Sequence, residues 1–397
     1  MKKRLTYRLL SLAALFFAAC GTDDPAPPRT VERTLLVYIA GDNNLAANGY
    51  DDLASITAAM EGFSGDARTL VYLDIPGENP RLLDVTPSGQ RELYRWPSPQ
   101  NSASGATLAE VIALTRQFAP ARRYGLVLWS HGVGWLPASA QNYLTRSAFR
   151  EASPWPATKW FGQDVTASPT GYIDTGELAA AIPDGMFDYI LFDACHMASV
   201  EVLYALRRKT EWIVSSPTEV VADGFPYDVA LPYLTAAAPD LKAVCGSFYD
   251  YYAEHPKPRY RSVSVSLVRT SELDALAEAT AELYGAALAH DPAAFSAMDI
   301  SRVQHLDRYR RHFIFDLDAI AGELERVGDV SAAEIARWRA QLARTVVWEA
   351  HTAAFFDLPL EVCCGLSGYV PVAAYPDLNP DYAALEWTAR INKYDMQ

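Results

Sequence analysis

The sequence is poor in cysteine and in basic residues for a chain of its length. It holds 5 cysteines among 397 residues, and 34 Lys and Arg against 48 Asp and Glu, which gives a net charge of −14. Nucleic acid is therefore not expected as a partner, because its recognition needs a basic surface. So few cysteines in a long chain, half of it hydrophobic, exclude a small disulfide-rich scaffold.

The cysteines also lack the spacing of a metal site. The chain contains no CxxC pair and no cluster of Cys and His, so no zinc site is predicted. Cys363 and Cys364 are adjacent in the apolar segment LEVCCGLSGYV, and we expect both to be small buried hydrophobic residues.

The N-terminus carries the features of an export signal. A basic segment, MKKRLTYR, precedes the apolar run LLSLAALFFAA, which is too short to span a bilayer, and Cys20 follows at once. This order resembles a bacterial lipobox. We therefore expect residues 1–19 to be a lipoprotein signal peptide, Cys20 to be lipidated, and 20–32 to be a Pro-rich tether that anchors the exported chain to the outer membrane or the periplasmic face. The alternative is an ordinary secretory signal that is cleaved after Ala19.

Short apolar segments alternate with helical patterns along the chain. Strands are expected at 34–40, 68–75, 124–132, 187–195 and 211–217, and helices at 45–60 and 106–118. This alternation predicts an α/β fold with a mostly parallel sheet covered on both faces. A core over 33–260 and a C-terminal α/β part over 261–397, packed on that core, are expected. In the latter we predict strands at 261–270 and 365–372 and helices at 271–288 and 332–350.

Two of the predicted strands end in residues that could perform chemistry together. YGLVLW is followed by Ser130-His131-Gly132, and YILF by Asp193-Ala194-Cys195. If the strands are parallel neighbours, His131 and Cys195 meet at one sheet edge, where an imidazole can take the proton of a thiol. The Gly132 N–H could bind an oxyanion, as could that of Gly134, and a helix starting after Cys195 would favour a thiolate. The alternative is a buried structural cysteine and a core histidine.

The segments around these residues, LVLWSHGVGW and YILFDACHMASVEVLYAL, together resemble the clostripain family of cysteine peptidases, relatives of caspases, gingipains and legumains. RTLLVYIAGDNNL, SSPTEVVADGFPYDVAL, SVSLVRTSELDALAEA and GLSGYVPV extend the resemblance over most of 33–375. It implies a caspase-like three-layer α/β/α sandwich with C-terminal additions. It also implies an endopeptidase with a catalytic dyad, in which Cys195 is the nucleophile and His131 the general acid/base.

The resemblance further implies cleavage after Arg or Lys, with acidic residues in the pocket that binds this side chain. Asp193 occupies the matching position, and Asp223 is the candidate for a second carboxylate. Each has a simpler alternative, because Asp193 could cap a helix and Asp223 could serve a turn before Gly224.

Two further properties of the family bear on this chain. Some members cut themselves between the histidine and the cysteine, and the long predicted loop at 136–171 offers Arg146, Arg150 and Lys159. Calcium dependence also occurs in the family. No loop of EF-hand type is present and GDNN (41–44) is interpreted as a turn, so no cofactor and no metal site is predicted.

One position departs from the family pattern. The residue after the nucleophile is usually apolar, and here it is His196, which could line the substrate pocket or point into the fold. Two alternatives to a peptidase stay open: an inactive binding lipoprotein that keeps the peptidase fold, and an envelope hydrolase or transpeptidase acting on another acyl substrate. The expected partners are a peptide or protein substrate and, through the lipid, the membrane, with the protein a monomer.

Overall fold

A computed structural model describes residues 28–137, 140, 164–166, 171–373 and 375–392. The predicted signal peptide, the lipidation site Cys20 and the basic loop residues Arg146, Arg150 and Lys159 lie outside the described residues. No helix in the described part of the chain is both long and apolar enough to cross a membrane.

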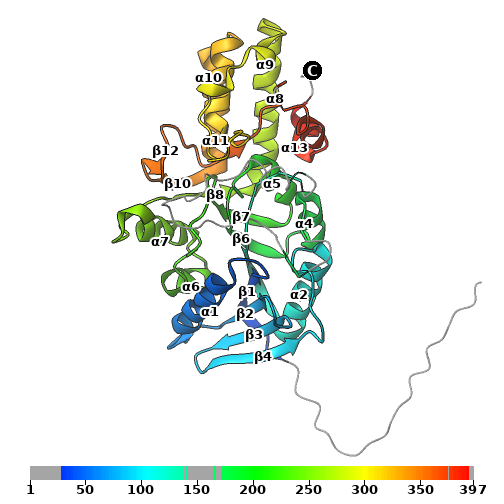
Figure 1. The fold of residues 1–397 in the computed structure, drawn as a ribbon, viewed down its shortest axis with the longest axis vertical. Helices are drawn as coiled ribbons and strands as arrows, with labels where there is room; N and C mark the ends of the chain where they lie inside the picture. The colour runs from blue at the N-terminus through cyan, green and yellow to red at the C-terminus, as the bar shows by residue number, and fades with distance from the viewer. Residues whose placement is uncertain (1–27, 138–139, 141–163, 167–170, 374, 393–397) are drawn as a thin grey trace, which may run out of the picture.

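A nine-stranded sheet forms the centre of the described structure, in the order β10-β8-β7-β6-β5-β1-β2-β3-β4 (Figure 1). Its parallel part consists of β1 (Val31–Ala40), β2 (Ala67–Asp74), β5 (Ala121–Trp129), β6 (Phe187–Asp193) and β7 (Thr210–Ser215). Antiparallel strands complete both sides, namely β3 (Arg81–Thr86) and β4 (Gly89–Arg95) on one side, and β8 (Ser264–Arg269) and β10 (Val346–His351) on the other. All five strands predicted before residue 260 are present.

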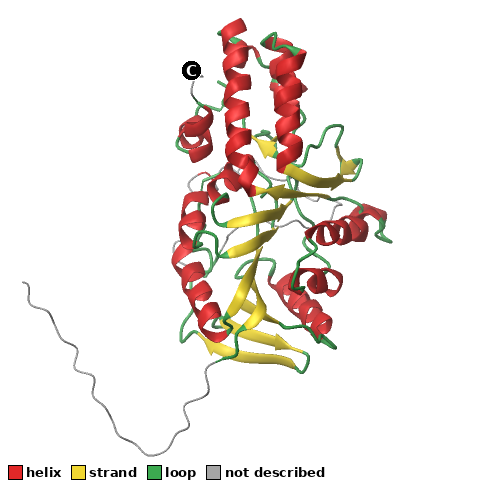
Figure 2. Cartoon of the chain, turned by 180° about the vertical axis from the view of Figure 1, so that it is seen from behind, coloured by secondary structure: helices red, strands yellow, loops and turns green. Residues whose placement is uncertain are grey.

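Helices cover both faces of this sheet, as Figures 1 and 2 show. One face carries α1 (Ala46–Met60), α6 (Tyr227–Thr235) and α7 (Leu241–Ala253), and the other carries α2 (Gly105–Phe118), α4 (Thr175–Ala181) and α5 (Val200–Leu206). The parallel strands can be almost continuously apolar because neither face meets water, and Leu35, Val37, Val127 and Leu191 are all fully buried. The predicted three-layer α/β/α sandwich with a mostly parallel sheet is confirmed.

The C-terminal part extends the sheet and adds a helical layer beyond it. α8 (Leu273–His290), α10 (Leu317–Val327) and α11 (Ala332–Thr345) pack together next to β8 and β10, and α13 (Glu386–Ile391) packs against α8 and α5 (Figure 1). The Trp338 indole N–H donates to the Thr280 hydroxyl at 3.0 Å, which ties α11 to α8. The shorter elements are β9 (Phe315–Asp316), β11 (Ala354–Phe355), β12 (Leu358–Pro359), β13 (Ser367–Gly368), α9 (Ala294–Ala297), α12 (Asn379–Ala383) and the 3-10 turns η2 (Pro258–Tyr260), η3 (Thr270–Glu272) and η4 (Ile300–Arg302).

The structure corrects two of the predicted elements and adds a hairpin that was not predicted. The helix expected over 332–350 ends at Thr345, because the β-branched pair Val346-Val347 begins strand β10 instead. The strand expected at 365–372 shrinks to Ser367–Gly368. The β3–β4 hairpin was not predicted, since β4 is mostly exposed and polar and gives no apolar pattern.

All four cysteines in the described residues are free thiols. Cys363 is buried, as expected, whereas Cys364 is partly buried. Burial raises the pKa of the Cys363 thiol, which keeps it protonated and unreactive at neutral pH.

A buried carboxyl group joins α5 to the C-terminal part. Glu201 is 2 % exposed, and it accepts hydrogen bonds from the Ser199 hydroxyl and from the Tyr369 N–H at 3.0 Å. Burial raises its pKa from 4.5 to about 7. Because the folded-state pKa lies above the unfolded one, folding is favoured by the protonated acid, and this contribution is lost as the pH rises from about 4.5 through about 7.

Replacement of Glu201 by Gln should therefore stabilise the protein at alkaline pH relative to the wild type. The difference in free energy of unfolding should grow by up to roughly 3 kcal/mol between about pH 5 and pH 8. Urea denaturation of both proteins across this range measures it. Glu61→Gln at an exposed position provides the control, and an equal pH dependence in all three proteins would contradict the assignment.

Candidate active site

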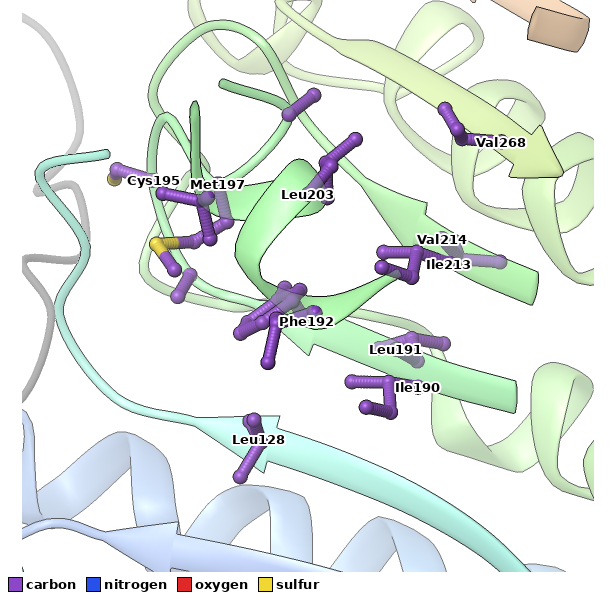
Figure 3. Close-up of a cluster of buried hydrophobic side chains, with 14 of the residues drawn as sticks. Leu128, Ile190, Leu191, Phe192, Cys195, Met197, Leu203, Ile213, Val214 and Val268 are labelled. Carbon is purple, nitrogen blue, oxygen red and sulfur yellow. The ribbon is translucent and has the colours of Figure 1, made fainter. Parts of the chain in front are cut away.

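The register between β5 and β6 brings the two predicted catalytic residues to one sheet edge. Trp129 pairs with Asp193 where the parallel strands end, and His131 and Cys195 each follow two residues later. Figure 3 shows Cys195 on the turn beyond β6, past the apolar side chains of that strand. The structure thus confirms that the two segments are parallel neighbours.

Gly132 brings the two chain segments into direct backbone contact. A Cβ atom at this position would lie 2.1 Å from the Cys195 carbonyl oxygen and 2.7 Å from the Cys195 nitrogen. Only glycine permits so close an approach, since any side chain would displace the backbone of Cys195. Gly132, proposed above as an oxyanion donor, therefore also sets the separation between the histidine and cysteine segments.

His131 is held in place by a residue that the sequence did not single out. The ring is 2 % exposed, and its Nε2 atom lies 2.8 Å from the Asn44 Oδ1 atom. An amide oxygen can only accept, so the ring donates its proton from Nε2, which leaves Nδ1 as the nitrogen that can accept one. Asn44 belongs to the turn between β1 and α1, where GDNN forms the turn that was expected.

Cys195 is buried and its sulfur receives a backbone hydrogen bond. The side chain is 1 % exposed, and the Val220 N–H donates to Sγ at 3.0 Å. The Sγ atom also lies 3.6 Å from the Val220 carbonyl oxygen, to which the thiol can donate, so both polar groups of Val220 contact the sulfur. The prediction that a helix begins directly after Cys195 and supports a thiolate is wrong. Residues 194–198 form a turn, and α5 begins only at Val200.

His196 points into the fold and interrupts the helix. Its φ of +58° is a left-handed conformation, which an α-helix cannot contain. The ring is fully buried, with Nδ1 3.2 Å from the Pro217 carbonyl oxygen and the ring of Tyr309 at 5.9 Å. Burial lowers the pKa of His196, so the ring is neutral at physiological pH.

Of the two carboxylates proposed to recognise a basic side chain, Asp223 lies in the loop before α6 and Asp193 contacts the end of that loop. Asp193 is fully buried, and its Oδ2 atom accepts hydrogen bonds from the Tyr227 hydroxyl at 2.9 Å and the Phe225 N–H at 3.2 Å. Asp223 is exposed in the turn before Gly224, whose φ is +66°. Both carboxylates act on the hydroxyl group of Tyr252. Burial raises the pKa of this group, and the negative charges of Asp223 and Asp193 also raise it.

The positions of Asp193 and Asp223 decide whether each has the simpler role considered for it, as a helix cap or as a turn residue. Asp193 does not cap α5, because the residue before that helix is Ser199 and Asp193 is the last residue of β6. Asp223 does occupy an Asp-Gly turn, which is compatible with a second role because its side chain is exposed there.

The C-terminal part reaches this edge through Arg308, which the sequence analysis did not identify. Its guanidinium forms two hydrogen bonds to Glu219, at 2.6 and 3.1 Å, and the carboxylate is buried. Glu219 precedes Val220, the donor to the Cys195 sulfur, so this ion pair positions the donor. No motif surrounds Arg308, and only the folded structure could reveal the pair.

A cluster of buried acidic residues lies near the start of α1. Asp42, Asp74 and Asp164 each offer an oxygen atom within 4.8 Å of those of the other two, which makes them the one group in the described residues with the geometry to hold a metal ion.

Comparisons with known proteins agree with this architecture. The profile of the Clostripain family matches residues 37–336. An inactive zymogen C11 protease from Parabacteroides distasonis is 30% identical, with a TM-score of 0.76 over 92% of this chain and 99% of that one. A secreted C11 cysteine protease from Bacteroides thetaiotaomicron, solved in complex with an irreversible peptide inhibitor, is 26% identical, with a TM-score of 0.73 over 91% of this chain and 99% of that one. No curated protein matches the chain.

The fold is thus that of the caspase-like cysteine proteases, confirming the expected fold class. The family match covers well over half of the sequence, and the chain belongs to the Clostripain family of cysteine peptidases.

The contact between Asn44 and His131 can be tested by mutation. Asn44→Ala removes the acceptor that orients the ring, and we expect kcat for a peptide substrate to fall by about threefold to tenfold with little change in KM or Tm. Asn44→Asp keeps an oxygen acceptor and should restore most of the rate. Steady-state kinetics of the three proteins test this, and a full rate in Asn44→Ala would show that the contact is dispensable.

Proposed function

We propose that this protein is an endopeptidase of the cell envelope that cleaves peptide bonds after Arg or Lys by means of Cys195 and His131. The observation that carries the proposal is the backbone contact between Gly132 and Cys195, which brings the histidine and cysteine segments together at the ends of β5 and β6.

The reaction follows from the chemistry of the two side chains. The His131 ring takes the Sγ proton of Cys195, and the thiolate attacks the carbonyl carbon of the substrate. The Gly132 N–H donates to the oxyanion that forms. The C–N bond then breaks while His131 returns the proton to the leaving amine, and a thioester remains on Cys195. Water, deprotonated by His131, hydrolyses the thioester and releases the carboxylic acid and the free enzyme.

The preference for a basic residue rests on the carboxylates. Asp193 at the end of β6 and Asp223 in the exposed turn would together attract a guanidinium or an ammonium group. The Phe225 N–H and the Tyr227 hydroxyl hold Asp193 in place, so its position does not depend on a substrate.

Two further parts of the proposal concern the whole chain. Lipidation of Cys20 would anchor the protein to the membrane, and the residues up to 32 would form a tether. Cleavage at Arg146, Arg150 or Lys159 would separate the segment with His131 from that with Cys195 without removing either from the sheet. The protein is proposed to act as a monomer.

Loss of the nucleophile tests the enzyme itself. Fluorogenic peptides ending in Arg, Lys, Gln and Asp are incubated with the wild-type protein and with Cys195→Ala, with Cys245→Ala as a second buried-cysteine control. We expect hydrolysis of the Arg and Lys peptides by the wild type and by Cys245→Ala, and a loss of at least about a thousandfold in Cys195→Ala.

No hydrolysis of any peptide by the reduced wild-type protein, before or after limited proteolysis by trypsin, would favour an inactive binding protein of the same fold. Equal hydrolysis by Cys195→Ala would remove the assigned nucleophile.

Neutralising Asp193 tests the specificity. Asp193→Asn keeps a side-chain oxygen for the Tyr227 hydroxyl but removes the charge, so kcat/KM for Arg peptides should fall by about tenfold to a hundredfold while that for Gln peptides changes little. Asp228→Asn, an exposed position in the first turn of α6, is the matched control. An unchanged ratio of kcat/KM for Arg peptides to kcat/KM for Gln peptides would show that Asp193 does not recognise the positive charge of the substrate.

A further inference from the structure

A cavity of about 500 Å³ lies at the end of the sheet opposite to the candidate active site. Residues near the starts of β1, β5, β6 and β7 line it, together with Arg269, which ends the antiparallel strand β8. The α6–α7 loop and the first residues of α7 form the facing wall (Figure 1). Cys195 lies beyond the other end of β6, so this cavity is separate from the catalytic edge. Its volume is typical of pockets that bind small organic molecules.

A buried guanidinium in the cavity wall has one nitrogen without a partner. Arg33 is 0 % exposed, and its Nε and Nη2 atoms donate to the carbonyl oxygens of Ala236 and Ala237 at 2.9 and 3.2 Å. Its Nη2 atom also lies 2.8 Å from Asp188. The Nη1 atom is buried, and no described residue accepts a hydrogen bond from it. Arginine stays protonated and an unsatisfied buried donor costs free energy, so Nη1 needs an acceptor that the described chain does not supply.

The wall of the cavity holds more positive than negative charge, although the whole chain carries −14. Its charged residues are Arg33, Arg123, Lys242 and Arg269 on the positive side and Asp188, Glu211 and Asp240 on the negative side.

The acidic members of this wall are engaged or exposed. Asp188 lies 2.8 and 3.0 Å from Arg33 and Arg123, and Asp240 accepts a hydrogen bond from the Ala243 N–H at 3.0 Å, at the start of α7. Glu211 is exposed, so solvent screens its charge. The cavity therefore favours a ligand of negative charge.

Apolar groups form the remaining wall and exclude a bare inorganic ion as the best fit. Tyr189 is fully buried, Leu267 is 3 % exposed, and both line the cavity beside Trp212. The Arg269 guanidinium lies 5.0 Å from the centre of the Trp212 ring. Because the cavity extends across the ends of strands from β1 to β10, it has room for an apolar body as well as a charged group. A ligand of this kind would also remove the apolar wall from water.

We propose that this cavity binds a small organic anion, whose carboxylate or phosphate group contacts Arg33 and whose apolar body lies toward Trp212 and Leu267. Arginine binds both kinds of oxyanion through charge-assisted hydrogen bonds, so either head group satisfies Nη1. Arg269 and Lys242 add positive charge along the cavity. The site is independent of the proposed peptidase activity, because it shares no residue with the catalytic edge.

Isothermal titration calorimetry on the purified protein tests the site with four probes: 2-naphthoate, 2-naphthyl phosphate, the neutral 2-naphthamide and inorganic phosphate. We expect at least one naphthyl anion to bind one-to-one with a Kd below about 1 mM. Naphthamide and inorganic phosphate should each bind at least about tenfold more weakly, since one lacks the charge and the other the apolar body. The tighter of the two naphthyl anions identifies the preferred head group.

Two variants locate the bound anion. Arg33→Gln should weaken binding by at least about tenfold because it removes the contact group, and Arg269→Glu by about threefold to tenfold because it reverses a nearby charge. Arg269 makes no hydrogen bond to the α6–α7 loop among the described residues, so this second variant covers the case in which Arg33→Gln fails to fold. Arg116→Glu, an exposed position in the last turn of α2, is the matched control and should bind as the wild type does.

Four outcomes would overturn the proposal: no binding of either naphthyl anion, naphthamide or inorganic phosphate binding as tightly as these anions, unchanged affinity in both folded cavity variants, or loss of binding in Asp193→Asn instead. The last result would place the anion at the catalytic edge. Since none of these measurements uses a peptide substrate, a protein that binds the anion but hydrolyses no peptide would contradict the proposed function and leave this site intact.

Discussion

The parallel pairing of β5 with β6 is the constraint on which the candidate site depends. It places the carboxyl ends of both strands at one edge, and every residue proposed to act on substrate lies on the segments that continue from these strands or pack on them. The pairing alone fixes only the strands. The absence of a side chain at Gly132 lets the two segments approach until their backbones touch, so that the histidine segment lies directly on Cys195.

Around this contact, buried carboxylates are stabilised by hydrogen-bond donors from other segments of the chain. Asp193 is fully buried but accepts hydrogen bonds from Phe225 and Tyr227, and Glu219 is buried but paired with Arg308. Both interactions also hold a loop against the sheet edge, so the same hydrogen bonds that offset desolvation position the groups facing a substrate.

The sequence was sufficient to predict the fold and to place His131 and Cys195 after two strands of one sheet, which prove to be parallel neighbours, because apolar strands and helical periods are local signals. It missed the β3–β4 hairpin, whose second strand is polar, and it placed a helix directly after Cys195, where the left-handed backbone of His196 delays the helix to Val200. Asn44 and Arg308 act through contacts between distant segments and leave no local pattern. The acidic cluster was missed for the same reason, since its three members come from separate loops and strand ends.

The central claim is that Cys195 is a nucleophile activated by His131, and covalent trapping tests it most directly. The protein is incubated with a peptide that ends in an Arg acyloxymethyl ketone, and mass spectrometry locates the adduct and follows its rate. We expect a single adduct on Cys195 that forms at least about a hundredfold more slowly in His131→Ala. An adduct on Cys245, Cys363 or Cys364, or an equal rate in His131→Ala, would contradict the pairing.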